Sequence, residues 1–378
     1  MRIGICFGGY CPLHQGHMDV IMRAKKENDI CYVIVCGYDN EPRGWEINLS
    51  LVERFNIISN FFKDDEQIRV RMINDTELGI DESMSDNNWK IWQNELVRIL
   101  NADEIPEIIN GVKKYGAYEF NWYIAEPYYK TCLERNHVIE DCFQFCNVNY
   151  NLIEKSNPVS GTLIRNNPVK YWNKITAPFK PYLCKNILVI GTASEGKSTL
   201  VKDIARYFDI PYAEEYGRTY MEEKGLKDTD LTFNDFVCFL TGQIVDCNEQ
   251  RVKSKNGVFI SDTDNTVTLM YAKAYVEDEA INISQKDYEG LHIMAKGLQD
   301  MEKHKWDHIF IFPPSKDFVD DGCRYMKQAS MDERTKNFLK LQELVNEFYP
   351  EVSKTYLNGT FLENFNEVKN YINGLFEV

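Results

Sequence analysis

The most informative stretch of this sequence is Gly8-Gly9-Tyr10-Cys11-Pro12-Leu13-His14-Gln15-Gly16-His17. Before it, Ile3, Ile5 and Phe7 alternate as in a β-strand, and after it residues 18–24 have helical character. Two histidines three positions apart at a helix start carry their imidazoles on one side of the first turn. The backbone N–H groups there lack helical partners, and the glycines let a phosphate come close. The stretch therefore predicts an anion-binding turn; the alternative is a simple turn with two solvated histidines.

The composition is that of a folded protein with more than one domain. The 378 residues are enough for two domains of ordinary size, and the apolar fraction of 44% excludes a disordered chain. A net charge of −15 argues against a basic face that binds nucleic acid, so we expect no nucleic-acid partner. Nucleotide binding stays open, because a few local donors and a metal ion hold a triphosphate against an acidic background.

Eleven cysteines without any Cys-x-x-Cys pair indicate reduced thiols, and neither a disulfide framework nor a zinc site is expected. Four of them lie in or beside apolar strand-like runs, as small buried side chains do: Cys6, Cys31, Cys36 and Cys184. The sequence starts directly with a strand pattern and has no apolar run of membrane-spanning length. We expect a cytoplasmic protein without a signal peptide or a membrane partner. Its oligomeric state, a homo-oligomer included, stays open.

Strand and helix patterns alternate through the first hundred residues. A continuous apolar run at 30–36 is typical of a central parallel strand, and a loop at 37–44, a helix at 51–62, a half-buried strand at 68–72 and a helix at 88–100 follow. This order predicts a doubly wound parallel sheet. Ligands of such sheets bind beyond the carboxyl ends of the strands, which is where His14 and His17 fall.

The segment 105–150 is harder to interpret. Its pattern fits a short strand that ends at 108–110, a helix at 118–134 and a strand at 143–148. Five aromatic residues in this segment either pack in the core or stack on a flat ligand ring: Tyr115, Tyr118, Phe120, Trp122 and Tyr123. Core packing is the more common role of such side chains.

A second polar turn lies at residues 158–168. Ser160 and Thr162 follow a proline-containing turn, and Arg165 comes shortly after them. A helix cap would explain Ser160, but it does not explain the arginine. Hydroxyls, free N–H groups and a guanidinium fork together predict a second phosphate cradle. Residues 169–172 fit a continuing helix.

A proline-containing break, Pro178-Phe179-Lys180-Pro181, separates the two halves of the chain, and we expect the domain boundary there. A complete P-loop follows it. Residues 185–190 form a buried-strand pattern that runs into Gly191-Thr192-Ala193-Ser194-Glu195-Gly196-Lys197-Ser198, and a helix opens at Thr199. A G-x-x-x-x-G-K-S string between a strand and a helix predicts a nucleotide-binding loop. We therefore expect two domains, at residues 1–177 and 184–378.

The second half continues as an α/β domain. A short strand and a loop are expected around residues 211–218, a long helix at 234–253, a strand at 257–261, a strand at 308–312 and a late helix that includes residues 341–348. Asp262 and Asp264 directly follow one of these strands, where a metal-bound phosphate would lie. The fold class is therefore α/β: a Rossmann-like domain followed by a P-loop kinase domain, both with parallel sheets.

The ordered set of motifs resembles a known enzyme family. His14-Gln15-Gly16-His17 together with Val159–Arg165 resembles the nicotinamide mononucleotide adenylyltransferases of the nucleotidyltransferase superfamily. The P-loop domain resembles a ribosylnicotinamide kinase through Glu215-Tyr216-Gly217-Arg218, Asp262-Thr263-Asp264 and Asp320-Asp321-Gly322-Cys323-Arg324. Their order resembles the bifunctional NadR proteins along essentially the whole chain. The helix-turn-helix repressor domain that begins some NadR proteins is not expected here, since the sequence starts at the catalytic strand.

The resemblance implies two reactions that use ATP and Mg²⁺, with ribosylnicotinamide, nicotinamide mononucleotide and NAD as the other ligands. For adenylyl transfer it implies ATP binding by Gly8, Gly9, Tyr10, His14, His17, Ser160, Thr162 and Arg165, with the two histidines catalytic. For phosphorylation it implies ATP binding by Gly191 to Thr199, Arg218 and Arg324, with Lys197, Asp262 and Asp264 catalytic and Ser198 and Asp262 on the metal. The sequence does not rank Asp262 and Asp264. A surface ion pair is the competing explanation for each arginine.

Two alternatives remain at this level. One is another adenylyltransferase of the superfamily, acting on pantetheine phosphate or a flavin nucleotide and fused to a small-molecule kinase. The other is a nucleotide-sensing regulatory protein that binds without turnover. The intact Lys197, Ser198, His14 and His17 argue against the regulatory protein.

Overall fold

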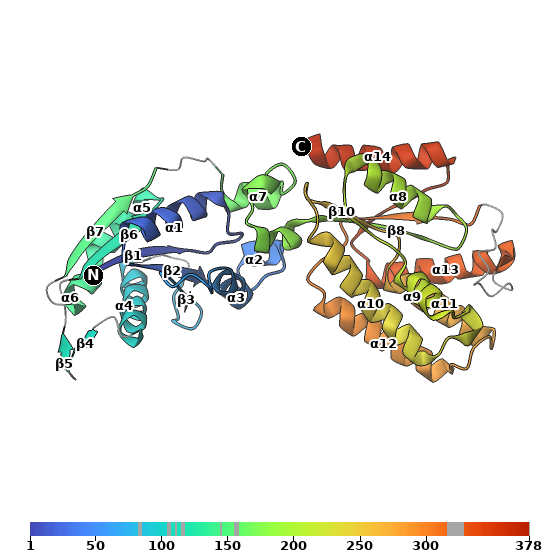
Figure 1. The fold of residues 1–378 in the computed structure, drawn as a ribbon, viewed down its shortest axis with the longest axis horizontal. Coiled ribbons are helices and arrows are strands. Elements are labelled where there is room, and N and C mark those ends of the chain that lie inside the picture. The colour runs from blue at the N-terminus through green and yellow to red at the C-terminus, as the bar shows by residue number, and fades with distance from the viewer. Residues whose placement is uncertain are drawn as a thin grey trace. The chain divides into compact units, whose positions relative to one another are not determined.

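The computed structural model describes residues 1–81, 85–103, 107–109, 112–114, 118–143, 146–154, 159–315 and 329–377. The chain divides into two compact units, Met1–Lys180 and Pro181–Val378. Each unit contains its own five-stranded sheet with helices around it (Figure 1). The expected fold class, two α/β domains with parallel sheets, is confirmed.

The sheet of the first unit has the order β3-β2-β1-β6-β7, and all of its strands are parallel. Its strands are β1 (Arg2–Gly8), β2 (Ile30–Gly37), β3 (Ile68–Asn74), β6 (Glu119–Ile124) and β7 (Asn147–Leu152). The chain first builds outward from β1 through β2 to β3, then returns to the other side of β1 with β6. Such a reversal opens a crevice beyond the carboxyl end of the central strand, and residues 8–17 lie there.

Helices cover both faces of this sheet. They are α1 (Gln15–Glu27), α2 (Pro42–Glu46), α3 (Leu51–Phe61), α4 (Asp86–Ala102), α5 (Pro127–Asn136), α6 (Val138–Cys142) and α7 (Gly161–Asn166). Ile3 and Ile5 of β1 point into the core formed with α4, α5 and α6. Gly4 faces the other way, and a Cβ there would lie 3.2 Å from the Ala24 carbonyl oxygen of α1. A short hairpin, β4 (Glu107–Ile109) with β5 (Val112–Lys114), and a 3-10 helix, Trp172–Lys174, complete the described part of this unit.

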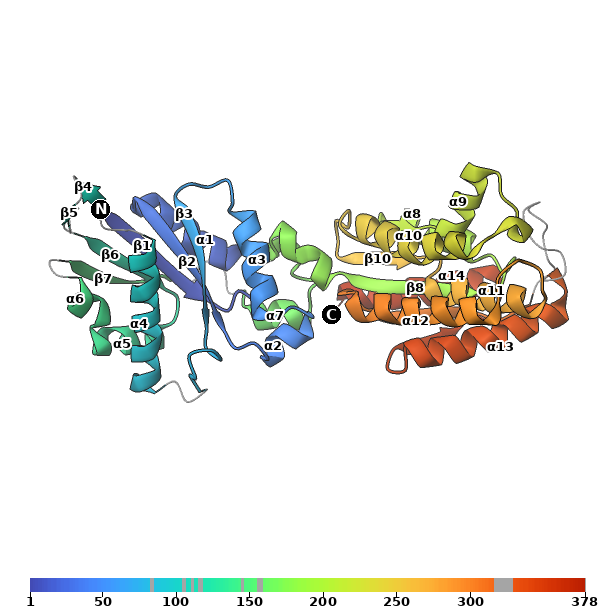
Figure 2. The ribbon, with the colours of Figure 1, turned by 90° about the horizontal axis from the view of Figure 1, so that it is seen from below.

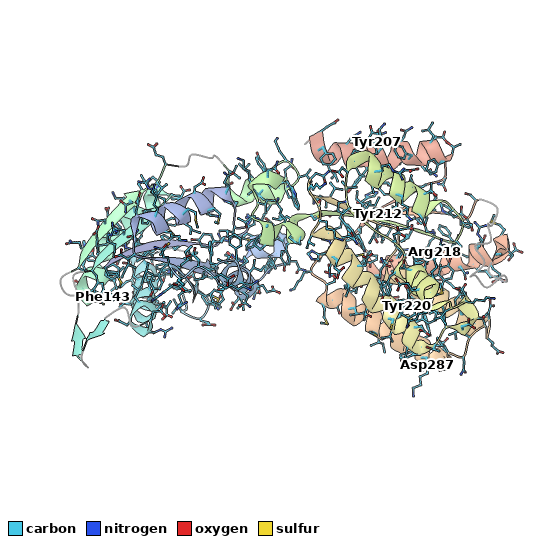
Figure 3. All side chains as sticks on the ribbon, in the orientation of Figure 1. Phe143, Tyr207, Tyr212, Arg218, Tyr220 and Asp287 are labelled. Atoms are coloured by element: carbon cyan, nitrogen blue, oxygen red, sulfur yellow. The ribbon has the colours of Figure 1, made fainter. Side chains whose placement is uncertain are left out.

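Four expectations for this unit are wrong. Residues 118–134 do not form one helix: β6 is a strand because Phe120, Trp122 and Ile124 alternate into the core, and α5 begins only at Pro127. The loop expected at 37–44 contains the start of α2. The strand expected at 143–148 begins only at Asn147; Phe143 (labelled in Figure 3) instead follows α6 and packs in the core. The helix that starts at Gly161 ends at Asn166 and does not continue through residues 169–172.

The aromatic residues of this segment are core residues where the structure describes them. Tyr118, Phe120, Trp122 and Tyr123 are each at most 4% exposed. Tyr115 lies outside the described residues. The core explanation is therefore the right one for these four side chains, because their rings pack on α4 and α6 or hydrogen-bond beneath α1.

The sheet of the second unit has the order β12-β11-β8-β10-β9, again all parallel. Its strands are β8 (Lys185–Gly191), β9 (Tyr212–Ala213), β10 (Val258–Ser261), β11 (His308–Phe312) and β12 (Ser353–Tyr356). The strand that carries the P-loop, β8, is central. The motif therefore opens at the middle of the sheet's carboxyl edge, between the ends of β10 and β11.

Two layers of helices enclose this second sheet. They are α8 (Lys197–Phe208), α9 (Tyr216–Lys224), α10 (Phe233–Arg251), α11 (Asn265–Glu277), α12 (Gln285–Met301), α13 (Met331–Phe348) and α14 (Phe361–Glu377), with 3-10 helices at Ala177–Leu183 and Asp228–Asp230. In Figures 1 and 2, α8 and α14 cover one face and α10 to α13 cover the other. The loop expected at the end of 211–218 is instead the first turn of α9.

The described cysteines are all free thiols, as expected from their spacing. Cys6, Cys31 and Cys184 are buried, and Cys36 is partly buried. None of the helices in the described ranges is both long enough and apolar enough to cross a membrane.

Candidate functional site

The two histidines of the first unit form a stacked pair at the start of α1. His14 is the N-cap, and its Nδ1 accepts a hydrogen bond from the Gly16 amide at 3.1 Å. The rings of His14 and His17 lie 3.8 Å apart between centroids, at an angle of 26°. Tyr10 packs its ring edge-on against His17 at 4.9 Å. The imidazoles thus share one side of the turn, as expected, and the cap bond fixes the orientation of the first ring.

The turn around Ser160 lies directly against this histidine turn, although the two are far apart in the sequence. A Cβ on Gly161 would stand 2.7 Å from the Cys11 carbonyl oxygen, so only glycine allows this close approach. Arg165 donates to the same carbonyl oxygen at 2.6 Å and forms an ion pair with Glu46. The predicted cradle residues therefore meet at the end of β1.

Ser160 and Thr162 differ in their surroundings. The Ser160 hydroxyl accepts a bond from the Leu163 amide, so it does cap α7. Thr162 is exposed, and its hydroxyl accepts a bond from Arg165 at 3.3 Å. Both hydroxyls keep a proton to donate to a ligand. Pro158, which precedes them, lies outside the described residues.

These turns line one cavity of about 530 Å³, which we call the histidine cavity. Gly8, Gly9, Tyr10, His14, His17, Ser160, Thr162 and Arg165 all contribute to it. Residues 123–126, at the end of β6, supply another side. All eight residues predicted to bind ATP in this unit are thus brought to one hollow.

A second cavity, also of about 530 Å³, adjoins the first, and we call it the aromatic cavity. It is lined by Phe7, Gly8, Gly9, Cys36, Gly37, Tyr38, Glu41, Pro42, Arg43, Glu46, Asp75, Ile80, Asn88, Trp89, Trp92, Tyr129 and Arg165. Six of these also line the histidine cavity: Phe7, Gly8, Gly9, Arg43, Tyr129 and Arg165. The two hollows therefore share a wall at the end of β1, so two ligands would meet there.

A buried ionic network that the sequence did not reveal supports this shared wall. Arg54 of α3 is fully buried; it donates to the Gly9 carbonyl and pairs with Glu41, which is 5% exposed. Arg43 pairs with the same carboxylate and lies over Gly9. In the sequence, Arg54 looks like an ordinary polar position of an amphipathic helix, so no local signal marks its role.

The P-loop of the second unit has the backbone geometry that its glycines predict. Gly191 has φ +153°, and a Cβ there would lie 2.5 Å from the Phe312 carbonyl oxygen of β11. Gly196 has φ +87° and directly precedes α8. The Lys197 Nζ folds back onto the loop and donates to the Thr192 carbonyl oxygen at 2.7 Å. The loop thus encloses the space in which phosphates bind at the start of α8.

Side chains of the P-loop do not all face that space. Glu195 is fully buried, pairs with Arg334 of α13 and accepts bonds from Ser315. It ties the loop to the segment after β11, so its contribution to a nucleotide would come from its backbone. Thr192 and Ala193 are also buried, Thr199 is exposed, and Ser194, Lys197 and Ser198 are partly exposed.

The structure distinguishes Asp262 from Asp264. Asp264 caps α11: its Oδ1 accepts from the Thr266 amide and hydroxyl, and its Oδ2 accepts from the Tyr349 hydroxyl at 2.5 Å. Asp262 is buried, yet its Oδ1 has no hydrogen-bond partner in the described part of the chain. Burial raises the pKa of Asp262 to about 6, against the opposing effects of Lys197 and Ser198. Asp264 therefore has a structural role, and Asp262 is the carboxylate with capacity left for a ligand.

Replacing Tyr349 by phenylalanine tests this structural role. We expect Tyr349→Phe to lower the free energy of unfolding of the second unit by about 1–3 kcal/mol, since a buried carboxylate oxygen loses its donor. Denaturant unfolding measures the change. Tyr356→Phe is the matched control, because the Tyr356 ring is 42% exposed and a change within about 0.5 kcal/mol is expected there. An equal effect of the two substitutions would contradict the assignment.

Two further polar residues, Glu215 and Arg218, lie close enough to Asp262 to affect it. Both belong to the turn that begins α9: Glu215 raises the pKa of Asp262, and Arg218 lowers it. Arg218 (labelled in Figure 3) is 42% exposed and lies 3.8 Å from Glu215. Arg218 therefore lies beside the carboxylate next to the P-loop. Glu215 was not among the predicted site residues, and Arg324 with its motif lies outside the described residues.

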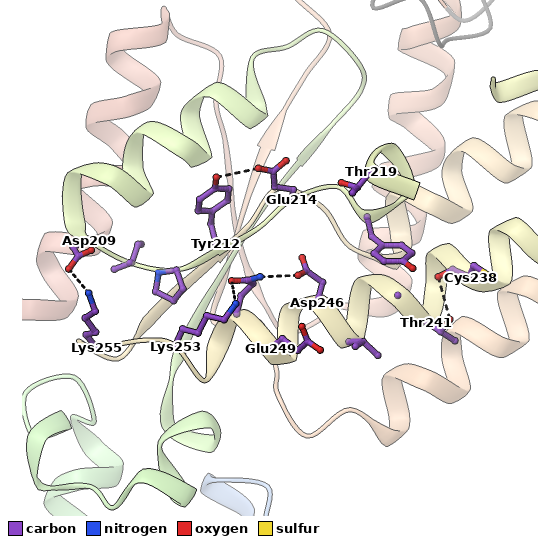
Figure 4. Close-up of a pocket in the computed structure, with 16 residues that line it drawn as sticks. Asp209, Tyr212, Glu214, Thr219, Cys238, Thr241, Asp246, Glu249, Lys253 and Lys255 are labelled. Atoms are coloured by element: carbon purple, nitrogen blue, oxygen red, sulfur yellow. Dashed lines mark hydrogen bonds and ion pairs between the residues drawn. The ribbon is translucent and has the colours of Figure 1, made fainter. Parts of the chain in front are cut away.

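A third cavity, in the second unit, lies away from the P-loop. It has a volume of about 1010 Å³ and follows the edge strand β9 and the outer side of α10. Asp209 and Lys255 line it at one end, and Thr219, Cys238 and Thr241 line it at the other (Figure 4). No residue of the P-loop contributes to it, so its size alone does not make it the site of phosphoryl transfer.

The fold and the two sites define a class of protein. A parallel-sheet unit with paired histidines at its central strand precedes a second unit with a P-loop, so the chain combines a nucleotidyltransferase with a P-loop kinase. Family comparisons agree: the cytidylyltransferase-like family matches residues 5–167, and an AAA domain family matches residues 186–356.

Comparison with individual proteins identifies the relatives. The trifunctional NAD biosynthesis/regulator protein NadR of Salmonella typhimurium is 26% identical over 97% of this chain and 83% of its own length. The crystal structure of a NadR protein in complex with NR superimposes with a TM-score of 0.81 at 27% identity, covering 100% of this chain and 96% of that one. Another, with NAD and AMP-PNP, gives a TM-score of 0.80 with the same identity and coverage. The chain is a homologue of the NadR proteins over nearly its whole length, which confirms the resemblance.

Proposed function

We propose that this protein is a bifunctional enzyme of NAD salvage. Its second unit phosphorylates ribosylnicotinamide to nicotinamide mononucleotide, and its first unit transfers the adenylyl group of ATP to that mononucleotide, giving NAD and pyrophosphate. One observation carries the proposal: each of the two parallel sheets has its own phosphate-binding turn at its central strand. The homology to NadR proteins along the whole chain supports the choice of substrates.

Adenylyl transfer requires positioning and charge stabilisation more than a protein nucleophile. The 5′-phosphate of nicotinamide mononucleotide attacks the α-phosphorus of ATP, and pyrophosphate leaves. The histidine cavity holds ATP, with His14 and His17 against its phosphates. Ser160, Thr162 and Arg165 hold the departing β- and γ-phosphates. The mononucleotide occupies the aromatic cavity, because only the wall shared by the two cavities brings both reacting phosphates together.

Phosphorylation follows the general scheme of P-loop kinases. The 5′-hydroxyl of ribosylnicotinamide attacks the γ-phosphorus of ATP while the loop from Gly191 to Gly196 surrounds the phosphates. Lys197 reaches the β- and γ-phosphates after it leaves the Thr192 carbonyl. Arg218 supplies a second cation at the opening of the site. Asp262 interacts with both Lys197 and Ser198, and it holds the metal or accepts the hydroxyl proton.

The residues present fit a magnesium ion in the second unit. The unpartnered Asp262 Oδ1 and the neighbouring Ser198 hydroxyl are hard oxygen ligands of the kind Mg²⁺ prefers. Bound there, Mg²⁺ would neutralise charge on the phosphates of ATP. Asp262 and Ser198 would hold the ion from the protein side, and the phosphates of ATP would supply further oxygen ligands.

We place adenylyl transfer in residues 1–177 and phosphorylation in residues 184–378. The abundance of free thiols among the described cysteines suits a reducing compartment, so we propose that the enzyme works in the cytoplasm. No nucleic acid or membrane takes part in either reaction.

A direct assay tests the proposal. Incubation with ATP, Mg²⁺ and ribosylnicotinamide should yield the mononucleotide first and NAD second. Riboflavin and pantetheine, offered separately, should not be phosphorylated or adenylylated at comparable rates. ATP binding without turnover of any of the three would favour a regulatory protein and would refute the proposed reactions.

The pH dependence of phosphorylation should report the carboxylate of Asp262. The pKa of Asp262 in the folded protein is about 6, above the ordinary value of an aspartate, so the folded state binds a proton at this group more tightly than the unfolded state does. Protonation of Asp262 as the pH falls through 6 therefore does not destabilise the folded protein. It does neutralise the carboxylate that the reaction needs. We expect kcat/KM of the kinase to fall about tenfold per pH unit below roughly pH 6. A constant value from pH 7 to 5 would contradict this role.

A further inference from the structure

The aromatic cavity has walls suited to a flat ring. Phe7 lies 5.3 Å from Trp92 and 5.4 Å from Tyr129 between ring centroids, and Trp89 lies 5.6 Å from Tyr129. Trp89 and Trp92 are almost fully buried, so their rings are fixed. Aromatic faces carry a negative quadrupole and attract a cation placed against them. The walls therefore favour a flat ligand, and a positively charged one above a neutral one.

One carboxylate on this cavity has an oxygen atom without a hydrogen-bond partner among the described residues. Asp75 follows the last residue of β3, and its amide donates to the Gly37 carbonyl oxygen at 2.9 Å. Its Oδ1 is buried and accepts no hydrogen bond from the described residues. Burial, and then the charge of Glu41, raise the pKa of this carboxyl to about 6 against the opposing effect of Arg43, so at neutral pH it is mostly charged.

The other charged side chains on the cavity are already engaged. Glu41 pairs with Arg54 and Arg43, and Glu46 pairs with Arg165. Arg43 forms its ion pair with Glu41, and its charge offsets only part of the rise in the pKa of Asp75. A partly buried carboxylate with an unsatisfied buried oxygen is unfavourable, and a ligand with a positive charge and N–H donors would remove this penalty.

We propose that Asp75 selects the carboxamide form of the mononucleotide, accepting a hydrogen bond from its amide and facing its cationic ring. This rests on the proposed function, since it assigns the aromatic cavity to the acceptor nucleotide. A nicotinamide ring in this nucleotide is a pyridinium cation with an NH₂ donor, which matches both the aromatic walls and the carboxylate. The nicotinic acid form replaces the amide with a carboxylate, which Asp75 repels.

The test is the ratio of kcat/KM for nicotinamide mononucleotide to that for nicotinic acid mononucleotide. We expect the wild-type protein to favour the amide and Asp75→Asn to reduce the ratio roughly 10- to 100-fold, the size expected when a buried charged partner is lost. The near-isosteric asparagine can donate to a carboxylate, so use of the acid form should improve. Glu77→Gln is the matched control: it removes the same charge two residues away, on an exposed side chain that does not line the cavity.

The outcomes separate the two levels of the proposal. If the wild type forms no NAD from the amide mononucleotide, the proposed function fails. If it does so but Asp75→Asn keeps the wild-type ratio, only the role of Asp75 fails. A second measurement needs no variant: the reduced, uncharged form of nicotinamide mononucleotide should bind the wild type about tenfold more weakly than the oxidised form. Equal affinities would overturn the role assigned to the cationic ring.

Discussion

Lys197→Ala is expected to abolish phosphorylation of ribosylnicotinamide and to leave adenylyl transfer at its wild-type rate. We expect a loss of roughly 10³-fold or more in kinase kcat, because the ammonium stabilises charge on the transferred phosphoryl group. In the described structure this side chain rests on the Thr192 carbonyl oxygen, within the loop that would surround the phosphates. Separate assays of mononucleotide formation and of NAD formation from supplied mononucleotide measure the two effects.

Lys255→Ala is the matched control for this substitution. Lys255 lies in the same unit, is 76% exposed and pairs with the equally exposed Asp209 at 3.2 Å. Exposed pairs of this kind contribute little to stability, so both activities should stay close to the wild type. Normal kinase turnover in Lys197→Ala would refute the P-loop mechanism. Loss of both activities together would refute the assignment of the reactions to separate sites.

His17→Ala should produce the converse result. We expect adenylyl transfer to fall roughly 10²- to 10³-fold, as when a preorganised donor is removed from a site of developing charge. The ring of His17 is held between His14 and Tyr10, so its orientation is fixed before ATP binds. Kinase activity should remain, since the P-loop belongs to the other unit.

His137→Asn serves as the control for the histidine substitution. His137 is 65% exposed, belongs to the same unit and does not line the histidine cavity. Its φ of 47° is a left-handed conformation that asparagine tolerates. We expect both activities to be unchanged in this variant. If His17→Ala transferred adenylyl groups normally, the role inferred for the paired histidines would be wrong.

Much of the fold could be predicted because its signals are local. A period of 3.6 residues marks α3, α4, α10 and α13, and continuous apolar runs mark β2, β8 and β11. The prediction failed where the local signal was ambiguous. Residues 118–134 are rich in aromatics and fit a helix by composition, but β6 lies between β1 and β7, and this position decides which side chains become buried.

The candidate site divides in the same way. Motif spacing alone pointed to His14, His17, Ser160, Arg165 and the P-loop, because a turn that binds phosphate is encoded in about ten consecutive residues. The structure brings the first four of these to one cavity. The ion pair of Arg54 with Glu41 and the burial of Glu195 could not be predicted from the sequence. Both depend on partners that only folding brings close.

The sequence by itself determined the two α/β domains, their order and the two phosphate-binding turns, since the patterns that predict each of them lie in residues close together in the chain. Only the tertiary structure decided which carboxylates remain available to a ligand. Asp264 is occupied by Tyr349, 85 residues away, whereas Asp262 and Asp75 are left with unpartnered buried oxygens in the described structure. The physical reason is that hydrogen bonding and burial are properties of the folded surroundings. Three aspartates of the same chemistry therefore differ in role only once the sheets and helices around them have formed.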